Sequence, residues 1–324
     1  MRRTTLPIHL LTHGQRRHSD KDKTKMLNNA ISIVGLGSMG YGMATSLVRA
    51  GHVVHGFDIA PAAMDRFVAD GGTAASLDDA ATASDILVIV VLNAAQTEAV
   101  LFGPDGWAKN LRKGAAIIAC ATVAPEFART CAARCAEMGL HYLDAPISGG
   151  AAKAALGKLS IMASGTQATF DAAAPALDAM AETVFRLGDE AGSGSAMKAV
   201  NQLLAGVHIA AMAEALTFGM TQGVAPAKFV EVISQCAGTS WMLENRAPHI
   251  VDGDYTPRSS VDIWPKDLGI VLDIAKSAKF GAPLTAAALQ QFLAASGSGH
   301  GGEDDAAVAK VYARNAGLKL PGEV

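Results

Sequence analysis

Three glycines near the start of the chain have the spacing of a turn that binds phosphate groups. Gly35, Gly37 and Gly40 follow an apolar, strand-like run at residues 31–34 and precede a helix-like segment. In such a turn the first glycine permits the bend, the second lets a diphosphate approach the backbone, and the third lets the helix pack on the strand. The N–H groups and dipole of the helix start attract the diphosphate. The residues between the glycines are expected to line the same site: Leu36, Ser38 and Met39.

Asp58 directly follows the next strand-like run, residues 52–57. A carboxylate at this place accepts hydrogen bonds from the adenosine ribose of NAD and repels the 2′-phosphate of NADP. Ile59 and Ala60 supply no cation, and Arg66 is at least a helical turn away. The pattern therefore predicts an NAD site. A structural βαβ unit without a ligand and a methyltransferase are the alternatives that the glycine turn by itself leaves open.

Two polar residues follow later strand-like runs. Asn93 comes after residues 85–92, and Thr122 comes after residues 114–121. The carboxyl ends of strands are where ligands bind in open α/β sheets. Each residue alone is more often a turn or cap residue. Together with the glycine turn, both become candidate cofactor contacts, with Thr122 near the nicotinamide ribose.

A second glycine-containing turn lies at residues 144–150, which read DAPISGG. Gly149 and Gly150 can adopt positive φ and turn successive N–H groups toward an anion, and Ser148 adds a hydroxyl donor. We interpret these three residues as a site for a substrate carboxylate. The alternative is an ordinary strand-to-helix turn.

Lys198 stands in the most apolar stretch of the chain, residues 196–220, and Asn201 lies three residues later on the same helical face. Burial disfavours the charged form of a lysine, which suits an amine that accepts and returns a proton near neutral pH. The alternative is a lysine whose ammonium reaches solvent. Lys266 is a second candidate cation, and by its position alone it is a surface lysine near a helix start. Candidates for surrounding the substrate's tail are Trp241, Asn245 and Arg246.

The elements that must position these residues alternate between strand and helix in the first half of the chain. The strand-like runs are residues 31–34, 52–57, 85–92, 114–121, 141–145, 159–163 and 184–187. This alternation predicts a doubly wound parallel sheet. Residues 195–222 then read as one long helix, and the rest is helical. We therefore expect a dinucleotide-binding domain at 28–192 and an all-helical domain at 193–324, with a mobile loop at 296–302.

Composition limits the function classes. The 324 residues are half apolar, with 27 basic and 30 acidic side chains and a net charge of −3. That balance argues against a nucleic-acid binder. Four cysteines in a chain of this length exclude a disulfide scaffold, and Cys131 and Cys135 have no second pair at zinc spacing, so we expect buried thiols and no metal site.

We expect no targeting or membrane segment. A transit peptide is the alternative for residues 1–27, but such a peptide would normally avoid aspartate, and Asp20 and Asp22 are present. Residues 1–27 are rich in Lys and Arg but lack the apolar core of a secretory signal, and we interpret them as a disordered basic tail. The apolar stretch at 196–220 contains several polar residues, which favours a buried helix over a membrane span. We therefore expect a cytoplasmic protein.

Taken together, the motifs resemble those of the β-hydroxyacid dehydrogenase family, which includes 3-hydroxyisobutyrate dehydrogenases. The resemblance covers residues 30–320 and rests on the segments GLGSMGYGMATSLVRAGHVVHGFD, DAPISGG, MKAVNQL and PKDLGIV. It implies a Rossmann-type domain, a long linking helix and an all-α domain that helps to form a homodimer or homotetramer. The segments SWMLENRAPHIVDGDYTPRSSVDIW and KDLGIVLDIAKS resemble the members that act on four-carbon sugar acids.

The resemblance also implies roles for the candidate residues. The glycine turn and Asp58 would bind NAD, and Thr122 and Lys266 would complete the cofactor site. Lys198 would be the catalytic residue, and Asn201 would orient the reacting group of a small sugar acid. Ser148, Gly149 and Gly150 would bind its carboxylate.

Four alternatives are weighed against this function. Reduction of tartronate semialdehyde and oxidation of 3-hydroxyisobutyrate use the same chemistry. A non-catalytic NAD-binding scaffold and an imine reductase are disfavoured because Lys198 and Asn201 are both present. Pro265 departs from the family pattern, which has a small or aliphatic residue before the lysine, and it fixes φ next to Lys266.

Overall fold

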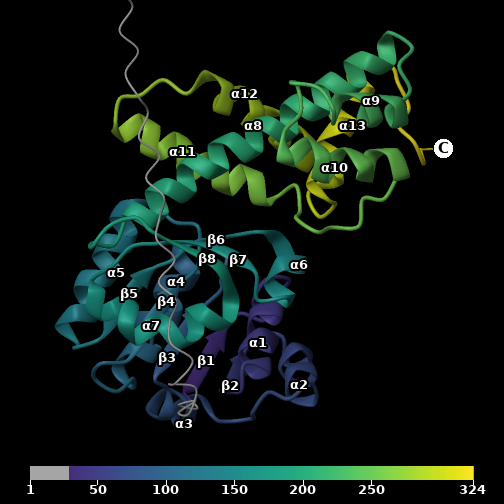
Figure 1. Ribbon diagram of the computed structural model, residues 1–324. Helices are drawn as coiled ribbons and strands as arrows, with labels where there is room; N and C mark the ends of the chain where they lie inside the picture. The colour runs from purple at the N-terminus through teal and green to yellow at the C-terminus, as the bar shows by residue number, and fades with distance from the viewer. Residues whose placement is uncertain (1–28, 324) are drawn as a thin grey trace, which may run out of the picture.

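The computed structural model describes residues 29–323, and the predicted basic tail lies outside them. An α/β part forms the lower half of the view in Figure 1, and a helical part lies above it. Five parallel strands build the main sheet in the order β2-β1-β3-β4-β5. They are β1 (Ala30–Val34), β2 (Val53–Phe57), β3 (Ile86–Ile89), β4 (Ala116–Ala119) and β5 (His141–Asp144). The strand order reverses between β1 and β3. In open α/β sheets the ligand-binding crevice lies outside the carboxyl ends of the strands at such a point.

Helices cover both faces of this sheet, as the sequence predicts. The central strand β3 is buried throughout, and its side chains alternate between two cores. Ile86 and Val88 pack with residues of the first helical layer, and Leu87 and Ile89 pack with residues of the second. The first layer is α1 (Gly40–Arg49), α6 (Gly150–Ala155) and α7 (Gln167–Met180); the second is α3 (Leu77–Ala83), α4 (Ala94–Phe102), the 3₁₀ turn η1 (Trp107–Lys109) and α5 (Pro125–Glu137). Helix α2 (Pro61–Ala69) follows β2.

The cysteines expected to be buried thiols are confirmed as such. Cys131 and Cys135 lie in the second core and form no disulfide. Burial raises the pKa of Cys131 to about 11 and that of Cys135 to about 12, so both stay protonated.

The last strands leave the parallel sheet, which differs from the prediction. β7 (Leu159–Ala163) pairs in parallel with β8 (Ala181–Arg186) and antiparallel with the short, unpredicted β6 (Ile147–Ser148). Pro146 accounts for the change, because it has no N–H to continue the ladder of β5 and its carbonyl accepts instead from Met162 N at 2.9 Å. The small second sheet therefore begins just before the DAPISGG glycines.

The helical part is built around α8 (Ser193–Thr221). Its other helices are α9 (Pro226–Ile233), α10 (Trp241–Asp252), α11 (Ile263–Ser277), α12 (Pro283–Ala295), the 3₁₀ turn η3 (Asp305–Val308) and α13 (Ala309–Asn315). By length and composition α8 could cross a membrane. It contacts α10, α11, α12 and α13, however, and Gly206 lets the side chains of Trp264 and Leu268 come close to its backbone. We therefore interpret it as a core helix.

The loop predicted at 296–302 is only partly present. Residues Ser296–His300 follow α12 as a π-helical turn, labelled η2, which is kinked at Gly299 with φ +93°, and residues 301–302 form a turn. The π-helical turn is tied to its surroundings, because Ser296 Oγ donates to Asp262 at 2.6 Å and Arg314 donates to Ser298 Oγ at 2.7 Å. Side-chain partners from distant segments override the loop preference of glycine and serine.

A buried carboxylate joins the two parts. Asp144, at the end of β5, is 1% exposed and accepts hydrogen bonds from Gly192 N at 2.9 Å and Ser195 N at 2.8 Å. Ser195 Oγ donates to its other oxygen at 2.6 Å. Gly194 is required beside it, because a Cβ there would lie 2.7 Å from the Asp144 carbonyl oxygen. The carboxylate thus satisfies the free N–H groups that begin α8 and fixes the direction of the helix.

Ser195→Ala tests this junction. The change removes a buried hydrogen bond to an ionised group, so we expect the free energy of unfolding in urea to fall by about 2 kcal/mol. Ser193→Ala is the matched control on the exposed side of the same helix start, with an expected change within about 0.5 kcal/mol. Equal effects of the two substitutions would contradict the role given to Asp144.

Candidate active site

The glycine turn has three distinct environments. Gly35 adopts φ +100°, and a Cβ there would lie 2.1 Å from the Val90 carbonyl oxygen. A Cβ on Gly40 would lie 1.8 Å from the Gly35 carbonyl oxygen. A Cβ on Gly37 would meet nothing within 4 Å. The first and third glycines are thus required by the fold, while Gly37 borders open space at the start of α1.

The residues between the glycines divide in the same way. Ser38 is exposed, whereas the Leu36 side chain belongs to the core beneath the turn. Met39 is partly buried and precedes the first turn of α1. The Leu36 N–H donates to Asp58 Oδ2 at 2.7 Å, so it is engaged within the protein.

Asp58 lies beside this turn, as predicted. Its two oxygens accept from Leu36 N and, at 2.9 Å, from Ala60 N, which holds the carboxylate at the end of β2. Each oxygen keeps a lone pair for a ribose hydroxyl. Arg66, the cation considered from the sequence, stacks over the Tyr41 ring at 3.5 Å from its centroid. This arrangement supports NAD over NADP.

The carboxyl ends of β3 and β4 carry Asn93 and Thr122. Asn93 caps α4, its side chain accepting from Gln96 N at 2.9 Å, and Thr122 is partly buried. Lys266 reaches the same edge from α11 and donates to the Leu92 carbonyl at 2.6 Å. The structure thus brings Lys266 next to Asn93, although 173 residues separate them in the sequence. Contact of these residues with the cofactor stays a prediction.

Pro265 does not disturb this placement. It is the third residue of α11, which begins at Ile263. N–H groups in the first turn of a helix have no acceptor within the helix, so proline is tolerated there.

The DAPISGG turn has the backbone that its glycines predict. Gly149 has φ +134° and Gly150 has φ +76°, and a Cβ on Gly150 would meet no atom within 4 Å. Ser148 ends β6 and is partly exposed. The preceding residue, Ile147, accepts a hydrogen bond from Lys198 Nζ at 2.9 Å. The candidate catalytic amine therefore lies one residue from the candidate carboxylate site.

Lys198 is buried, being 9% exposed, so the alternative of a solvent-facing lysine is wrong. Desolvation lowers the pKa of Lys198 to about 8, and the charge of Lys266 acts in the same direction. The nearby carboxylate of Asp267 opposes both. A large share of the amine is therefore neutral at slightly alkaline pH, as a proton acceptor requires.

Two residues that the sequence analysis missed connect the predicted ones. Gln202, one helical turn after Lys198, accepts from Asn201 Nδ2 at 2.9 Å and donates to Asp267 Oδ2 at 2.5 Å. Asp267 also pairs with Lys266 Nζ at 2.8 Å. The i, i+4 spacing from Lys198 could have indicated Gln202 as a site residue. Nothing in the local sequence indicates Asp267, because its contact with Gln202 depends on the packing of α11 on α8.

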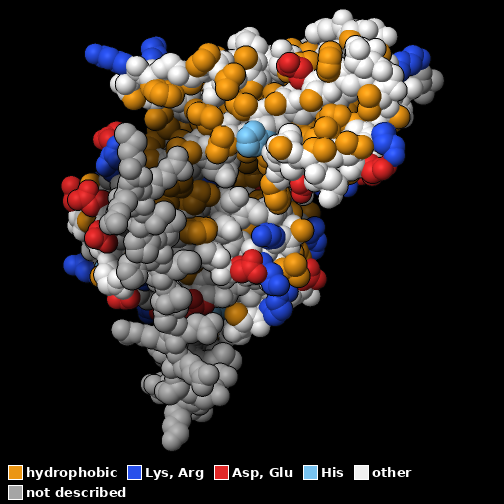
Figure 2. All heavy atoms as spheres, turned by 45° about the horizontal axis from the view of Figure 1, so that its top comes forward, with side chains coloured by type: hydrophobic (Ala, Val, Ile, Leu, Met, Phe, Trp, Pro, Cys, Tyr) orange, Lys and Arg blue, Asp and Glu red, His pale blue; other side chains and the backbone are white. Residues whose placement is uncertain are grey.

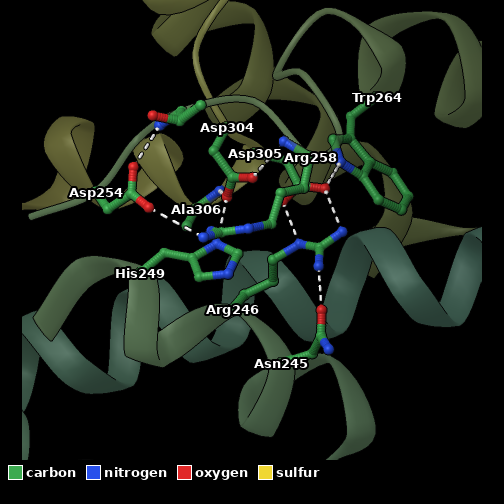
Figure 3. A network of polar contacts seen from close by, with 10 residues as sticks. Asn245, Arg246, His249, Asp254, Arg258, Trp264, Asp304, Asp305 and Ala306 are labelled. Atoms are coloured by element: carbon green, nitrogen blue, oxygen red, sulfur yellow. Dashed lines mark hydrogen bonds and ion pairs between the residues drawn. The ribbon is translucent and has the colours of Figure 1, made fainter. Parts of the chain in front are cut away.

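Of the residues proposed to surround the substrate's tail, Asn245 and Arg246 take part in a network of polar contacts within the helical part. Arg246 Nε donates to Asp305 Oδ1 at 2.5 Å, and Trp264 Nε1 donates to Asp305 Oδ2 at 3.0 Å (Figure 3). Asn245 accepts from Arg246, while Trp241 is exposed at the start of α10. The buried Asp305 thus holds the first turn of α11 through Trp264, which lies two residues before Lys266.

A neighbouring buried carboxylate completes this network. Asp304 pairs with His249 Nδ1 at 2.8 Å and accepts from Arg258 N at 3.1 Å (Figure 3). It also caps the following turn through Ala306 N. The network therefore joins α10, η3 and the start of α11.

The described residues fit a dinucleotide at the crevice. Open space beside Gly37, the helix start of α1 and the Asp58 carboxylate suit a diphosphate and an adenosine ribose. Lys198, the candidate proton acceptor, contacts the residue that directly precedes the Ser148–Gly149–Gly150 turn, the candidate carboxylate site. Residues 29–323 contain no group of three or more His, Cys, Asp or Glu side chains that could hold a metal ion.

Comparison with known proteins agrees with this geometry. Residues 30–188 match the NAD-binding domain model of 6-phosphogluconate dehydrogenase, and residues 192–312 match the NAD-binding model of NADP-dependent 3-hydroxyisobutyrate dehydrogenase. An L-threonate dehydrogenase of Cupriavidus necator is 51% identical over 92% of this chain and 99% of that protein. One from Escherichia coli K12 is 47% identical over 90% of this chain and 96% of that protein.

Solved structures give the same result. A crystal structure described as 3-hydroxyisobutyrate dehydrogenase from Salmonella typhimurium superposes with a TM-score of 0.82 and 48% identity, covering 87% of this chain and 99% of that one. The predicted fold, a doubly wound parallel sheet followed by a long helix and a helical domain, is confirmed. The chain belongs to the 3-hydroxyisobutyrate dehydrogenase-like family of NAD-dependent β-hydroxyacid dehydrogenases.

Proposed function

We propose that the protein oxidises the 2-hydroxyl of L-threonate with NAD and forms 2-oxo-tetronate (2-dehydro-L-erythronate). The observation that carries the proposal is the buried Lys198 amine, held on the Ile147 carbonyl beside Ser148. The substrate assignment is supported by five L-threonate dehydrogenases that are 44–51% identical over at least 90% of this chain.

The chain's own residues divide the work as follows. Ser148 and the N–H groups of Gly149 and Gly150 hold the substrate carboxylate, which selects the carbon that reacts. Asn201 orients the hydroxyl. Neutral Lys198 accepts the hydroxyl proton as the C2 hydrogen leaves with its electron pair. Bound NAD supplies the acceptor for that hydride.

The proposal includes assembly with further copies of the chain. Apolar side chains are exposed along one stripe of α8, namely Met197, Val200, Leu204 and Phe218. Figure 2 shows hydrophobic side chains over much of the visible face of the helical part. Such a surface is typical of a subunit interface. Sedimentation at a mass of two or four chains supports this assembly, and a monomer contradicts it.

We also propose that the protein is cytoplasmic and acts in the metabolism of four-carbon sugar acids.

A panel of hydroxy acids tests the substrate. NADH formation is followed with L-threonate, D-glycerate, 3-hydroxyisobutyrate and L-serine, each with NAD and with NADP. We expect kcat/KM for L-threonate with NAD to exceed the other values by about tenfold or more. A higher value for D-glycerate or 3-hydroxyisobutyrate would replace the substrate proposal with one of the two alternatives. A preference for NADP would contradict the role given to Asp58.

Lys198→Met tests the proton acceptor. We expect kcat to fall about 10²- to 10⁴-fold while the Kd for NAD stays unchanged, because the amine acts on the substrate's proton. In the wild-type enzyme kcat/KM should rise with pH up to about 8, where the amine loses its proton, and then level off. Lys276→Met, an exposed change on α11, is the control. Near-normal turnover of Lys198→Met would reject the mechanism.

Gly37→Ala tests the cofactor site separately. The new methyl group meets no protein atom, so the melting temperature should stay close to that of the wild type. It occupies the space expected for the diphosphate, so NAD should bind about tenfold more weakly by calorimetry. Gly281→Ala also adds a methyl group in open space and should leave NAD binding unchanged. Unaltered NAD affinity in Gly37→Ala would place the diphosphate elsewhere.

A further inference from the structure

A chain of polar contacts runs beneath the candidate site from one predicted residue to another. Asn201 donates to Gln202, Gln202 donates to Asp267 Oδ2, and Asp267 Oδ1 pairs with Lys266 at 2.8 Å. Lys266 in turn donates to the Leu92 carbonyl at the end of β3. The residue that would orient the hydroxyl is thereby linked to the residue that would contact the cofactor.

Asp267 is the centre of that chain. It is 2% exposed; its Oδ2 accepts from the Gln202 amide, and its Oδ1 lies 2.8 Å from Lys266 Nζ in an ion pair that lacks hydrogen-bond geometry. A carboxylate only accepts hydrogen bonds, so it dictates that the Gln202 NH₂ group points toward it. The Gln202 carbonyl oxygen must then face Asn201, which fixes the Asn201 amide as well.

We propose that Asp267 is a positioning residue of the active site: its buried carboxylate orients Asn201 through Gln202, holds Lys266, and supplies the negative charge that acts on the Lys198 amine. The role deepens the proposed function, because it rests on Lys198 as the proton acceptor.

The charges around Lys198 make this role measurable. Helix α11 presents two charged groups to the amine, Asp267 and Lys266, and they act in opposite directions. The contact from β6 is the uncharged Ile147 carbonyl, and the neighbours on α8, Asn201 and Gln202, are neutral. Loss of the Asp267 charge must therefore lower the pKa of Lys198, and loss of the Lys266 charge must raise it.

The experiment follows the reactivity of Lys198 in the enzyme without cofactor or substrate. Trace acetylation with acetic anhydride is measured at a series of pH values, and mass spectrometry quantifies the peptide that contains Lys198. Relative to the wild type, we expect the midpoint to fall by about one pH unit in Asp267→Asn and to rise in Lys266→Gln. Asp252→Asn, an exposed carboxylate of α10, should leave it unchanged.

Kinetics provide the second measurement. In Asp267→Asn the rise of kcat/KM with pH should move to lower pH by the same amount, and kcat should fall because Asn201 is less well oriented. Asp267→Glu retains the charge, so its midpoint should stay near that of the wild type while kcat falls.

Three results would overturn the inference: an unchanged midpoint in Asp267→Asn, shifts of the same sign in Asp267→Asn and Lys266→Gln, or a midpoint in Asp267→Glu as low as that expected for Asp267→Asn. If Asp267→Asn does not fold, the other two variants test the inference: it requires a near wild-type midpoint in Asp267→Glu and a raised midpoint in Lys266→Gln. A wild-type enzyme that does not oxidise L-threonate would reject the proposed substrate, but it would leave the labelling result intact.

Discussion

The carboxylate of Asp144 sits where the parallel sheet meets the long helix, and the geometry of the site depends on it. It is buried at the end of β5 and binds the backbone and side chain of Ser195 at the start of α8. Removal of a carboxylate from water is costly, and here the N–H groups and dipole of the helix start compensate for that cost. Lys198 follows three residues later, so the same contact directs its amine to Ile147.

A second junction brings the rest of the site to the same crevice. Helix α11 is held at its first turn by the hydrogen bond from Trp264 to the buried Asp305. Two residues further on, Lys266 reaches the carboxyl end of β3. One lysine from each of two helices, Lys198 of α8 and Lys266 of α11, therefore lies near the open backbone of the glycine turn, and the residues proposed for the chemistry are held on rigid elements.

Much of the fold could be predicted from the sequence, because the features that indicate it lie within short segments. The β-branched run of β3, the spacing of Gly35, Gly37 and Gly40, and the positive φ of the DAPISGG glycines each follow from short-range sterics and burial. The strand β6 escaped prediction because two residues after a proline show no periodicity. The chain from Gln202 to Asp267 escaped it because the contact joins residues 65 apart in the sequence. Only the packing of α11 on α8 creates that contact.

A crystal structure of the dead-end complex with NADH and L-threonate would test the central claim most directly. The account predicts that Lys198 Nζ lies within hydrogen-bonding distance, about 3 Å, of the C2 hydroxyl oxygen, with the substrate carboxylate on Ser148, Gly149 and Gly150. A complex in which Lys198 stays on the Ile147 carbonyl and another side chain contacts that hydroxyl would contradict it.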